Sequence, residues 1–279
     1  MKVFVAGAGG MVGRAVSQYC EGLGDQVVAA DHKSLDISDR DQVLAALTES
    51  LPDVVINCAA WTDVDGCEAD SARAYAANAT GPKNLAWASR LVRSGLVTIS
   101  TDYVFDGAKQ GFYTQRDDPN PQSVYGAAKL EGERGAQNSY ARTIVVRSGF
   151  IFGPGGKNFL SAVVQKVQRN EPIRAISDSF GTPTYAVDLA QRLRELAEMD
   201  LPGVFHIANA GDGASYEEFA RTVVQATGGK VVIEPVTDAS LQRPAPRPAN
   251  SRLKCLYSKA LGLSPLRSWQ EALAHFIQI

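Results

Sequence analysis

The 279-residue sequence has little of several residue types that mark whole classes of protein. It contains four cysteines, and none of them forms the CxxC pair of a structural zinc site. So few thiols argue against a disulfide framework and favour a reducing compartment. No run of about 18 apolar residues occurs, so we expect no membrane span. The apolar N-terminal run is too short for a signal peptide, and we expect a cytoplasmic protein.

An excess of charge of one sign is also missing. Lysine plus arginine is 28 and aspartate plus glutamate is 30, which gives a formal net charge of −2. A nearly neutral chain lacks the electrostatic footprint of a nucleic-acid binder or a polybasic membrane binder. Hydrophobic residues make up 45% and charged residues 21%, as in globular domains, which excludes a disordered chain. We therefore expect a small-molecule ligand, no nucleic acid and no membrane.

Short apolar runs alternate with helical patterns through the first half of the chain. We expect strands at 3–6, 26–30, 53–57, 96–100 and 143–147. We expect helices at 12–23, 39–49, 69–93 and 123–140. This alternation predicts an α/β fold of the Rossmann type, with a doubly wound parallel sheet covered by helices on both faces. The strands are apolar throughout, as expected for strands buried on both faces.

The chain changes character after residue 150. We expect domains at 1–150 and 151–279, the second a smaller C-terminal α/β lobe. Its expected helices are 158–169, 186–199, 216–227 and 268–277, and its expected strands are 204–207 and 231–233. Residues 107–122 and 243–250 are expected to be loops because they contain several prolines. Later segments could return to the sheet, which leaves the boundary open.

Three glycines stand between the first expected strand and the first expected helix. Gly7, Gly10 and Gly13 are three residues apart. Without side chains, such a turn lets backbone N–H groups approach a pyrophosphate, and the helix N-terminus adds partial positive charge. We expect Gly7, Gly10, Met11, Val12 and Gly13 to bind a dinucleotide. The alternative is a glycine-rich turn without a ligand.

The end of the second expected strand carries signals for the coenzyme. Asp31 can accept hydrogen bonds from the adenosine ribose, which favours NADH. Lys33 could instead meet a 2′-phosphate, which favours NADPH, so the preference stays open. Asp36 and Ile37 follow on the next loop and could pack on the adenine. Asp36 could equally cap a helix.

Tyr125 and Lys129 are four residues apart on an expected helix and therefore share a face. A nearby ammonium group lowers the pKa of a tyrosine, which makes it a usable proton donor. Thr101 ends the fourth expected strand, where its hydroxyl could hydrogen-bond a substrate carbonyl that becomes negative. Tyr125 would then protonate that oxygen. Thr101 and Asp102 could alternatively be strand-end capping groups.

Several segments together carry a resemblance to a known family. They are VINCAAWTDVDGCEAD (55–70), NATGPKNLA (78–86), STDYVFDG (100–107), VYGAAKLEGE (124–133), VRSGFIFG (146–153), GTPTYAVDLA (181–190) and RPANSRL (247–253). The sequence resembles the extended short-chain dehydrogenase/reductase superfamily, and within it the dTDP-4-dehydrorhamnose reductase family. The combination of STDYVFDG with YxxxK is specific, whereas the glycines alone are not.

The resemblance implies a Rossmann-type NAD(P)-binding domain, a nucleotide-sugar lobe, and reduction of the 4-keto group of dTDP-4-dehydrorhamnose to dTDP-L-rhamnose. It implies that Thr101, Tyr125 and Lys129 are the catalytic residues. Dinucleotide contacts are then expected from Ala59, Ala60, Thr62, Asn78, Tyr125 and Lys129. Sugar-nucleotide contacts are expected from Thr62, Val64, Thr101, Asp102, Tyr103, Phe150, Asn158 and Arg247. Some family members need Mg²⁺ at a dimer contact, so a homodimer and Mg²⁺ are further expectations, although the acidic residues show no metal spacing.

Two departures from the family pattern concern the sugar. Phe150 stands where a tryptophan is expected, and Ser179 follows Asp178 where the family usually has glutamine. Both leave the identity of the sugar open, since relatives reduce other nucleotide-linked keto sugars. A non-catalytic NADP-binding regulatory subunit, of the kind that serves methionine adenosyltransferase, is another alternative, and so is an epimerase. A dehydratase is disfavoured because Asp102 and Tyr103 follow Thr101, where an Asp-Glu pair is usual.

The remaining conspicuous side chains are interpreted as packing residues. His206 lies inside an apolar run and is expected to be buried and structural. Trp61, Trp87 and Trp269 are expected to pack in the core, with Trp61 able to face a pocket.

Overall fold

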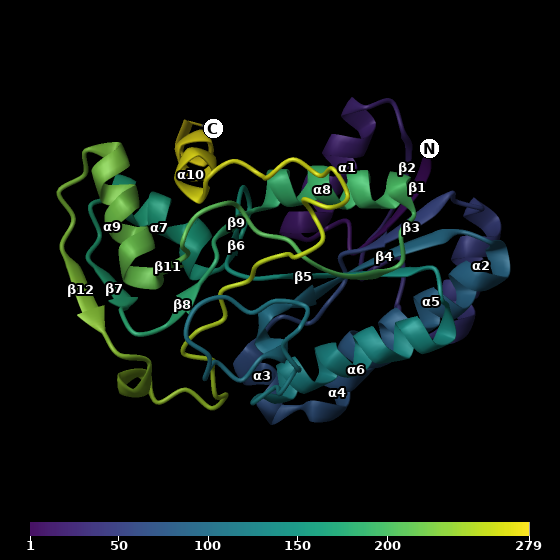
Figure 1. Ribbon diagram of the computed structural model, residues 1–279, viewed down its shortest axis with the longest axis horizontal. Helices are drawn as coiled ribbons and strands as arrows, with labels where there is room; N and C mark the ends of the chain where they lie inside the picture. Colours follow the sequence, from purple (N-terminus) through teal and green to yellow (C-terminus); the bar gives the residue numbers. More distant parts are fainter. Residues whose placement is uncertain (279) are drawn as a thin grey trace.

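Six strands form one parallel sheet at the centre of the computed structural model, which describes residues 1–278 (Figure 1). Their order is β10 (Gly203–His206), β5 (Thr143–Ser148), β4 (Gly95–Thr101), β3 (Val54–Asn57), β1 (Lys2–Ala6) and β2 (Gln26–Ala30). The order reverses between β1 and β3. Doubly wound sheets bind ligands at such a switch point, beyond the carboxyl ends of the strands.

Helices cover both faces of this sheet, as the apolar strands predict. One face carries α1 (Met11–Gly22) and α8 (Ala186–Met199) over a core that includes Val5 and Val146. The other face carries α2 (Arg40–Ser50), α5 (Gly81–Val92) and α6 (Val124–Ser139). The predicted fold class is therefore confirmed.

The long helix predicted at 69–93 is interrupted. The structure divides it into α4 (Ser71–Tyr75), a π-helical turn η1 (Ala76–Thr80) and α5, and a short α3 (Val64–Ala69) precedes them. Asp70 caps the start of α4 by accepting a hydrogen bond from the Arg73 N–H. A π-helical turn often marks a functional place in a helix. Here it positions Asn78, whose side chain supports the candidate site described below.

A smaller lobe packs around its own aromatic core, which contains Phe152, Phe219 and Trp269. Its helices are α7 (Phe159–Gln168), α9 (Tyr216–Thr227) and α10 (Trp269–Gln278). Three two-stranded ribbons complete it: β7 (Ile173–Ile176) with β12 (Ile233–Val236), β8 (Phe180–Gly181) with β11 (Ala214–Ser215), and β6 (Ile151–Phe152) with β9 (Thr184–Tyr185). The bounds predicted for a strand at 231–233 are wrong, because the pairing with β7 begins at Ile233.

Residues after position 150 contribute to both parts of the molecule. Helix α8 packs against α1, and β10 is the edge strand beside β5. After the short turn η3 (Asp238–Leu241), the chain leaves the lobe, crosses to the sheet and returns to α10 (Figure 1). Residues 247–254 of this path are called the crossing segment below. No helix within residues 1–278 combines the length and the apolar character that a membrane crossing needs.

Candidate active site

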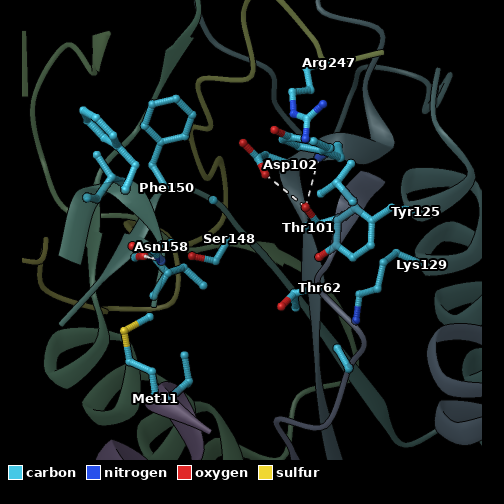
Figure 2. A pocket seen from close by; sticks show the side chains of 18 of the residues that line it. Met11, Thr62, Thr101, Asp102, Tyr125, Lys129, Ser148, Phe150, Asn158 and Arg247 are labelled. Carbon is cyan, nitrogen blue, oxygen red and sulfur yellow. Dashed lines mark hydrogen bonds between the residues drawn. The ribbon is translucent and has the colours of Figure 1, made fainter. Parts of the chain in front are cut away.

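Two adjoining cavities lie at the carboxyl ends of the sheet strands. The larger, of about 620 Å³, opens between the sheet and the lobe (Figure 2). The smaller, of about 450 Å³, extends from the glycine turn toward the end of β2. Gly10, Cys58, Ala59 and Ala60 line both. An elongated ligand can therefore run from the end of β2, past the glycine turn, to the lobe.

Two glycines of the turn, Gly7 and Gly13, are packed so closely that neither admits a side chain. Gly7 has a φ of +77°, and a Cβ there would lie 2.5 Å from the Ala59 nitrogen. A Cβ on Gly13 would lie 2.1 Å from the Gly7 carbonyl oxygen. Gly10, the N-cap of α1, has no side chain to satisfy the first N–H groups of that helix. The turn therefore has the close packing and the uncapped helix N-terminus that the predicted pyrophosphate site requires.

The structure separates the predicted glycine-turn residues by their roles. Gly7 and Gly10 line the smaller cavity, while Gly10, Met11 and Val12 line the larger one. Gly13 is buried beneath the turn and lines neither. Its position allows the close helix-to-turn contact on which the cavity depends.

Asp31, Asp36 and Ile37 all line the smaller cavity, as predicted for residues near the adenosine. One carboxylate oxygen of Asp31, Oδ1, accepts hydrogen bonds from the Lys33 and Ser34 N–H groups, at 2.9 and 3.2 Å. These bonds hold the pKa of Asp31 below its ordinary value. The alternative that Asp36 caps a helix is wrong, because Asp39 is the N-cap of α2.

Sequence reasoning did not assign the cationic residues of this cavity. His32 and Arg73 both line it, whereas Lys33 is absent from its walls. The Arg73 guanidinium lies 4.3 Å from the centre of the Trp61 ring, and Trp61 also faces this cavity. Nothing in the sequence near Arg73 indicates that it lines this cavity, because only the folding of α4 brings it there.

Tyr125 and Lys129 lie on the face of α6 that points into the larger cavity (Figure 2). The Lys129 Nζ donates a hydrogen bond of 2.6 Å to the Ile99 carbonyl oxygen. Burial lowers the pKa of Lys129 to about 8, against the attraction of Glu133. Burial also raises the pKa of Tyr125 well above its ordinary value; a hydrogen bond donated by Thr101 would lower it, and the charge of Asp102 raises it further. This direction is opposite to the one expected from a nearby ammonium group.

Thr101 lies at the end of β4, beside Tyr125, and lines the same cavity (Figure 2). Its hydroxyl donates to the Asp102 carboxylate at 3.0 Å and accepts from the Tyr103 N–H at 3.1 Å. Asp102 is only 3% exposed, and burial raises its pKa to about 6. The structure thus joins the three predicted catalytic residues in one place. It also gives Thr101 the capping role considered as the alternative, whereas the Asp102 carboxylate accepts from the Thr101 and Ser251 hydroxyls.

The loop after β3 is held by two asparagines. The Asn57 side chain accepts from the Ala59 N–H at 3.0 Å, and Asn78 both accepts from and donates to the Trp61 backbone, at 3.0 Å each. Asn78 is fully buried and lines neither cavity, so it supports the loop from behind. Ala59, Ala60, Thr62 and Val64 line the larger cavity.

The predicted sugar-nucleotide residues differ in how free their side chains are. Tyr103 and Phe150 line the larger cavity, and the Phe150 ring packs 4.5 Å from that of Tyr216. Asn158 lines it too, yet its amide caps α7 by accepting from the Ser161 N–H and also donates to the Ile151 carbonyl. Arg247 lines it and is held by two hydrogen bonds to Asp65, of 3.0 and 2.8 Å.

Arg174, Tyr216 and Arg243 line the same end of the cavity and were not found from the sequence. They come from β7, the start of α9 and the loop after η3. Only tertiary contacts bring these segments together. The sole sequence signal was the arginine-rich, proline-rich stretch at 243–250, which was interpreted as a loop.

His206 is 3% exposed and lines neither cavity, in agreement with a structural role. Burial lowers its pKa to about 4. Trp269 is buried in the lobe core, and Trp87 lies under the Arg40 guanidinium at 3.7 Å. Among residues 1–278, no group of three or more His, Cys, Asp or Glu side chains is placed to hold a metal ion.

The fold and the site define a dinucleotide-dependent oxidoreductase of the extended short-chain dehydrogenase/reductase class. The family model described as "RmlD substrate binding domain" matches residues 1–279. The chain is 37% identical to a dTDP-4-dehydrorhamnose reductase from Streptomyces griseus, over 96% of this chain and 90% of the relative. The chain therefore belongs to the dTDP-4-dehydrorhamnose reductase family.

Solved structures of similar sequence agree with this family assignment. A dTDP-4-dehydrorhamnose reductase from Clostridium acetobutylicum is 37% identical and superposes with a TM-score of 0.95, covering 100% of this chain and 99% of that one. A second, from Bacillus anthracis in complex with NADP, is 33% identical with a TM-score of 0.95, covering 99% and 98%. A UDP-glucose 4-epimerase from Thermus thermophilus, 23% identical with a TM-score of 0.86 and covering 100% and 98%, shares the fold.

Proposed function

We propose that this chain reduces the 4-keto group of dTDP-4-dehydrorhamnose to give dTDP-L-rhamnose. The observation that carries the proposal is the meeting of Thr101, Tyr125 and Lys129 in the cavity that joins the glycine turn to the lobe. The named relatives, which match almost the whole chain, support the same reaction.

A reduced nicotinamide dinucleotide, when bound, supplies the hydride for such a reduction. Tyr125 is placed to give its hydroxyl proton to the substrate oxygen, and its raised pKa keeps that proton on the phenol until the oxygen becomes basic. Lys129 presents its ammonium group to the cavity, where it can hold ribose hydroxyls and stabilise the phenolate that remains. Exclusion of bulk water by the cavity walls strengthens both interactions.

The glycine turn and the smaller cavity are proposed to hold the dinucleotide, with contacts from Gly7, Gly10, Met11, Val12, Asp31, Asp36, Ile37, Ala59, Ala60 and Thr62. Gly13 and Asn78 act by shaping this site. Either NADH or NADPH is proposed to serve. Asp31 has a second oxygen for ribose hydroxyls, whereas Arg73 offers positive charge to a 2′-phosphate and His32 lines the same cavity. The NADP complex of the Bacillus anthracis relative supports NADPH.

The lobe side of the cavity is proposed to hold the dTDP-sugar. Thr62, Val64, Tyr103 and Phe150 would contact the sugar or base. Arg174, Arg243 and Arg247 supply the positive charge that a diphosphate needs. On this proposal residues 1–150 form most of the dinucleotide-binding domain and residues 151–279 most of the nucleotide-sugar lobe, with α8 and β10 belonging to the first.

The test follows the absorbance of NADPH or NADH with enzymatically generated dTDP-4-dehydrorhamnose. Rapid oxidation, with dTDP-L-rhamnose as the product, is expected. Tyr125→Phe should bind the dinucleotide normally and lose turnover by about a thousandfold or more, because only the donated proton is removed. Full activity of this variant would refute the assigned role of Tyr125.

A second candidate is the reduction of another dTDP-linked keto sugar. Phe150 favours it, because its ring forms an apolar wall without the N–H donor of a tryptophan. A Streptomyces antibioticus relative, 36% identical over 98% of this chain and 93% of its own length, is named as a probable 4-ketoreductase of a different dTDP-sugar. Turnover of such a sugar with none of dTDP-4-dehydrorhamnose would favour this candidate.

Cytoplasmic location, a homodimer and a role for Mg²⁺ stay predictions. The mass in solution, measured with and without EDTA, tests the last two together. A non-catalytic regulatory role predicts dinucleotide binding without oxidation of any keto sugar, and a stable complex with a synthetase.

A further inference from the structure

Asp102 is a buried carboxylate beside the catalytic residues, and both of its oxygens already receive hydrogen bonds. Oδ1 accepts from the Thr101 hydroxyl at 3.0 Å, and Oδ2 accepts from the Ser251 hydroxyl. On another side the carboxyl group lies against Gly149, where an added Cβ would be 2.3 Å from the Asp102 Cγ. The group is therefore confined on several sides and held in one orientation.

Ser251 belongs to the crossing segment and is anchored independently of Asp102. Its N–H donates to the Phe180 carbonyl at 2.8 Å, and the Phe180 N–H donates to the Ala249 carbonyl at 2.9 Å. Two residues further on, the Leu253 N–H donates to the Thr182 hydroxyl at 2.9 Å. Ser251 itself is 1% exposed. The second donor to Asp102 is thus fixed by the lobe, 149 residues away in the sequence.

The Thr101 hydroxyl has one proton and two acceptor lone pairs. Its proton is given to Asp102, and one lone pair receives the Tyr103 N–H. One lone pair remains, and Thr101 lies beside Tyr125 at the wall of the cavity (Figure 2). As long as Asp102 takes the proton, Thr101 can only accept a hydrogen bond on the cavity side.

We propose that Asp102 is a positioning residue that takes the hydroxyl proton of Thr101 and so leaves Thr101 facing Tyr125 and the substrate as an acceptor only. This inference rests on the proposed function. It replaces two expectations from the sequence, namely a substrate contact by Asp102 and a hydrogen bond donated by Thr101 to the developing oxyanion. Ser251 keeps the carboxylate turned toward Thr101.

The arrangement suits a reductase because the acid must stay protonated until hydride arrives. A hydrogen bond accepted by Thr101 from the Tyr125 hydroxyl stabilises the neutral phenol. When C4 of the ketone gains hydride, its oxygen becomes the stronger acceptor. The Tyr125 O–H bond then breaks, its proton passes to that oxygen to give the alcohol, and the phenolate remains on Tyr125.

The test is a set of variants that separate the hydrogen-bond acceptor of Asp102 from its charge. Asp102→Asn keeps an acceptor for Thr101, and its amide N–H can donate to Ser251, whose hydroxyl can turn to the Phe180 carbonyl. It should retain kcat within about threefold of wild type. Asp102→Leu has a similar size and no acceptor, and should lower kcat on the order of 10- to 100-fold. Dinucleotide affinity should stay unchanged in both.

A double variant shows whether Asp102 acts through Thr101. If it does, Thr101→Val combined with Asp102→Leu should be no slower than Thr101→Val alone. If the double variant lost kcat by the product of the two single losses, the proposal would be overturned. Equal losses of kcat in the Asn and Leu variants of Asp102 would overturn it as well. Asp106→Asn is the matched control, because Asp106 accepts from the Ala108 N–H and the Tyr113 hydroxyl outside the cavity. It should keep the wild-type kcat.

A spectroscopic readout works without substrate and keeps the two proposals distinguishable. In the full chain labelled at threonine, the buried Thr101 hydroxyl proton should give a slowly exchanging NMR signal that Thr101→Val removes. The signal should persist in Asp102→Asn and be lost or strongly shifted in Asp102→Leu. Unchanged spectra in Asp102→Leu would overturn the positioning role. This test can be made at low temperature even if Asp102→Leu is too unstable for kinetic assays. A wild-type chain that shows the signal but reduces no keto sugar would refute only the proposed function.

Discussion

The two halves of the cavity are built in different ways. The half proposed to hold the dinucleotide is closed at the glycine turn by backbone and small residues such as Gly10, Ala59 and Ala60, which lie in the loops after β1 and β3. The sugar half is walled by long side chains, among them Phe150, Arg174, Tyr216 and Arg243, which come from separate segments of the lobe. The first half should therefore lose affinity for its ligand when atoms are added to the glycine turn. The second half should lose affinity for its ligand when atoms are removed from its side chains.

Among the variants that test this comparison, the largest effect is expected where the two halves meet. Lys129→Met removes the ammonium group beside both ligands and should lower kcat on the order of 10²- to 10³-fold, since the phenolate left on Tyr125 loses its counter-charge. Steady-state kinetics at saturating dinucleotide measures this. Lys83→Met, on the exposed side of α5, is the control and should leave kcat unchanged. A Lys129→Met enzyme with wild-type kcat would contradict the role given to Lys129.

An added methyl group in the glycine turn should weaken dinucleotide binding. In Gly13→Ala the new Cβ would overlap the Gly7 carbonyl, so the turn must shift. We expect dinucleotide affinity to fall about a hundredfold, by loss of the backbone hydrogen bonds to the pyrophosphate. Gly22→Ala is the matched control in the same helix, since its Cβ would meet nothing within 4 Å. Titration of dinucleotide fluorescence measures both, and equal affinities in the two variants would argue against a tight turn.

Removing one charged side-chain group should weaken substrate binding in the sugar half and leave dinucleotide binding unchanged. Arg243→Met removes a cation from the cavity wall and should raise the substrate KM about tenfold, the usual cost of one charge-assisted hydrogen bond. Dinucleotide affinity should not change. Arg221→Met, on the exposed side of α9, serves as the control. If Arg243→Met changed dinucleotide affinity instead, the assignment of the two halves would be reversed.

The smallest effect concerns the sheet that supports both halves. Burial lowers the pKa of His206 from 6.5 to about 4, so between these values the unfolded chain binds more protons at this site than the folded one. Stability should therefore fall as the pH decreases from 6.5 toward 4, with a loss of less than about 1 kcal/mol already between pH 7 and pH 6. Urea unfolding of the wild type and of His206→Phe at both pH values measures the difference. The same pH dependence in both proteins would exclude His206 as its source.

Prediction from the sequence succeeded where neighbouring residues decide the structure. The five strands predicted before residue 150 are present, because each is an apolar run; four of them are buried on both faces of the sheet, and the edge strand β2 is partly exposed. The glycine turn and the Tyr125–Lys129 pair were also found, since three-residue spacing and one helical turn are local properties. The resemblance to the reductase family rested on STDYVFDG (100–107), the YxxxK pair and five further segments, and it is confirmed.

Prediction failed where distant segments decide it. The ribbons β6–β9 and β8–β11 are two residues long in each strand, too short to leave a periodic pattern. The raised pKa of Tyr125 could not be foreseen, because desolvation depends on the surroundings of the side chain and not on its neighbours in the helix.

The sequence by itself determined the sheet, the glycine turn and the placement of Tyr125 and Lys129 on one face of a helix. Backbone conformation and helical spacing are set over a few neighbouring residues, so they can be predicted from the sequence of one chain. Only the tertiary structure decided which arginines face the sugar half, which cations face the adenosine end, and that Ser251 holds Asp102 against Thr101. Hydrogen bonds and burial join groups that are close in space, and 149 residues separate Asp102 from its partner in the chain.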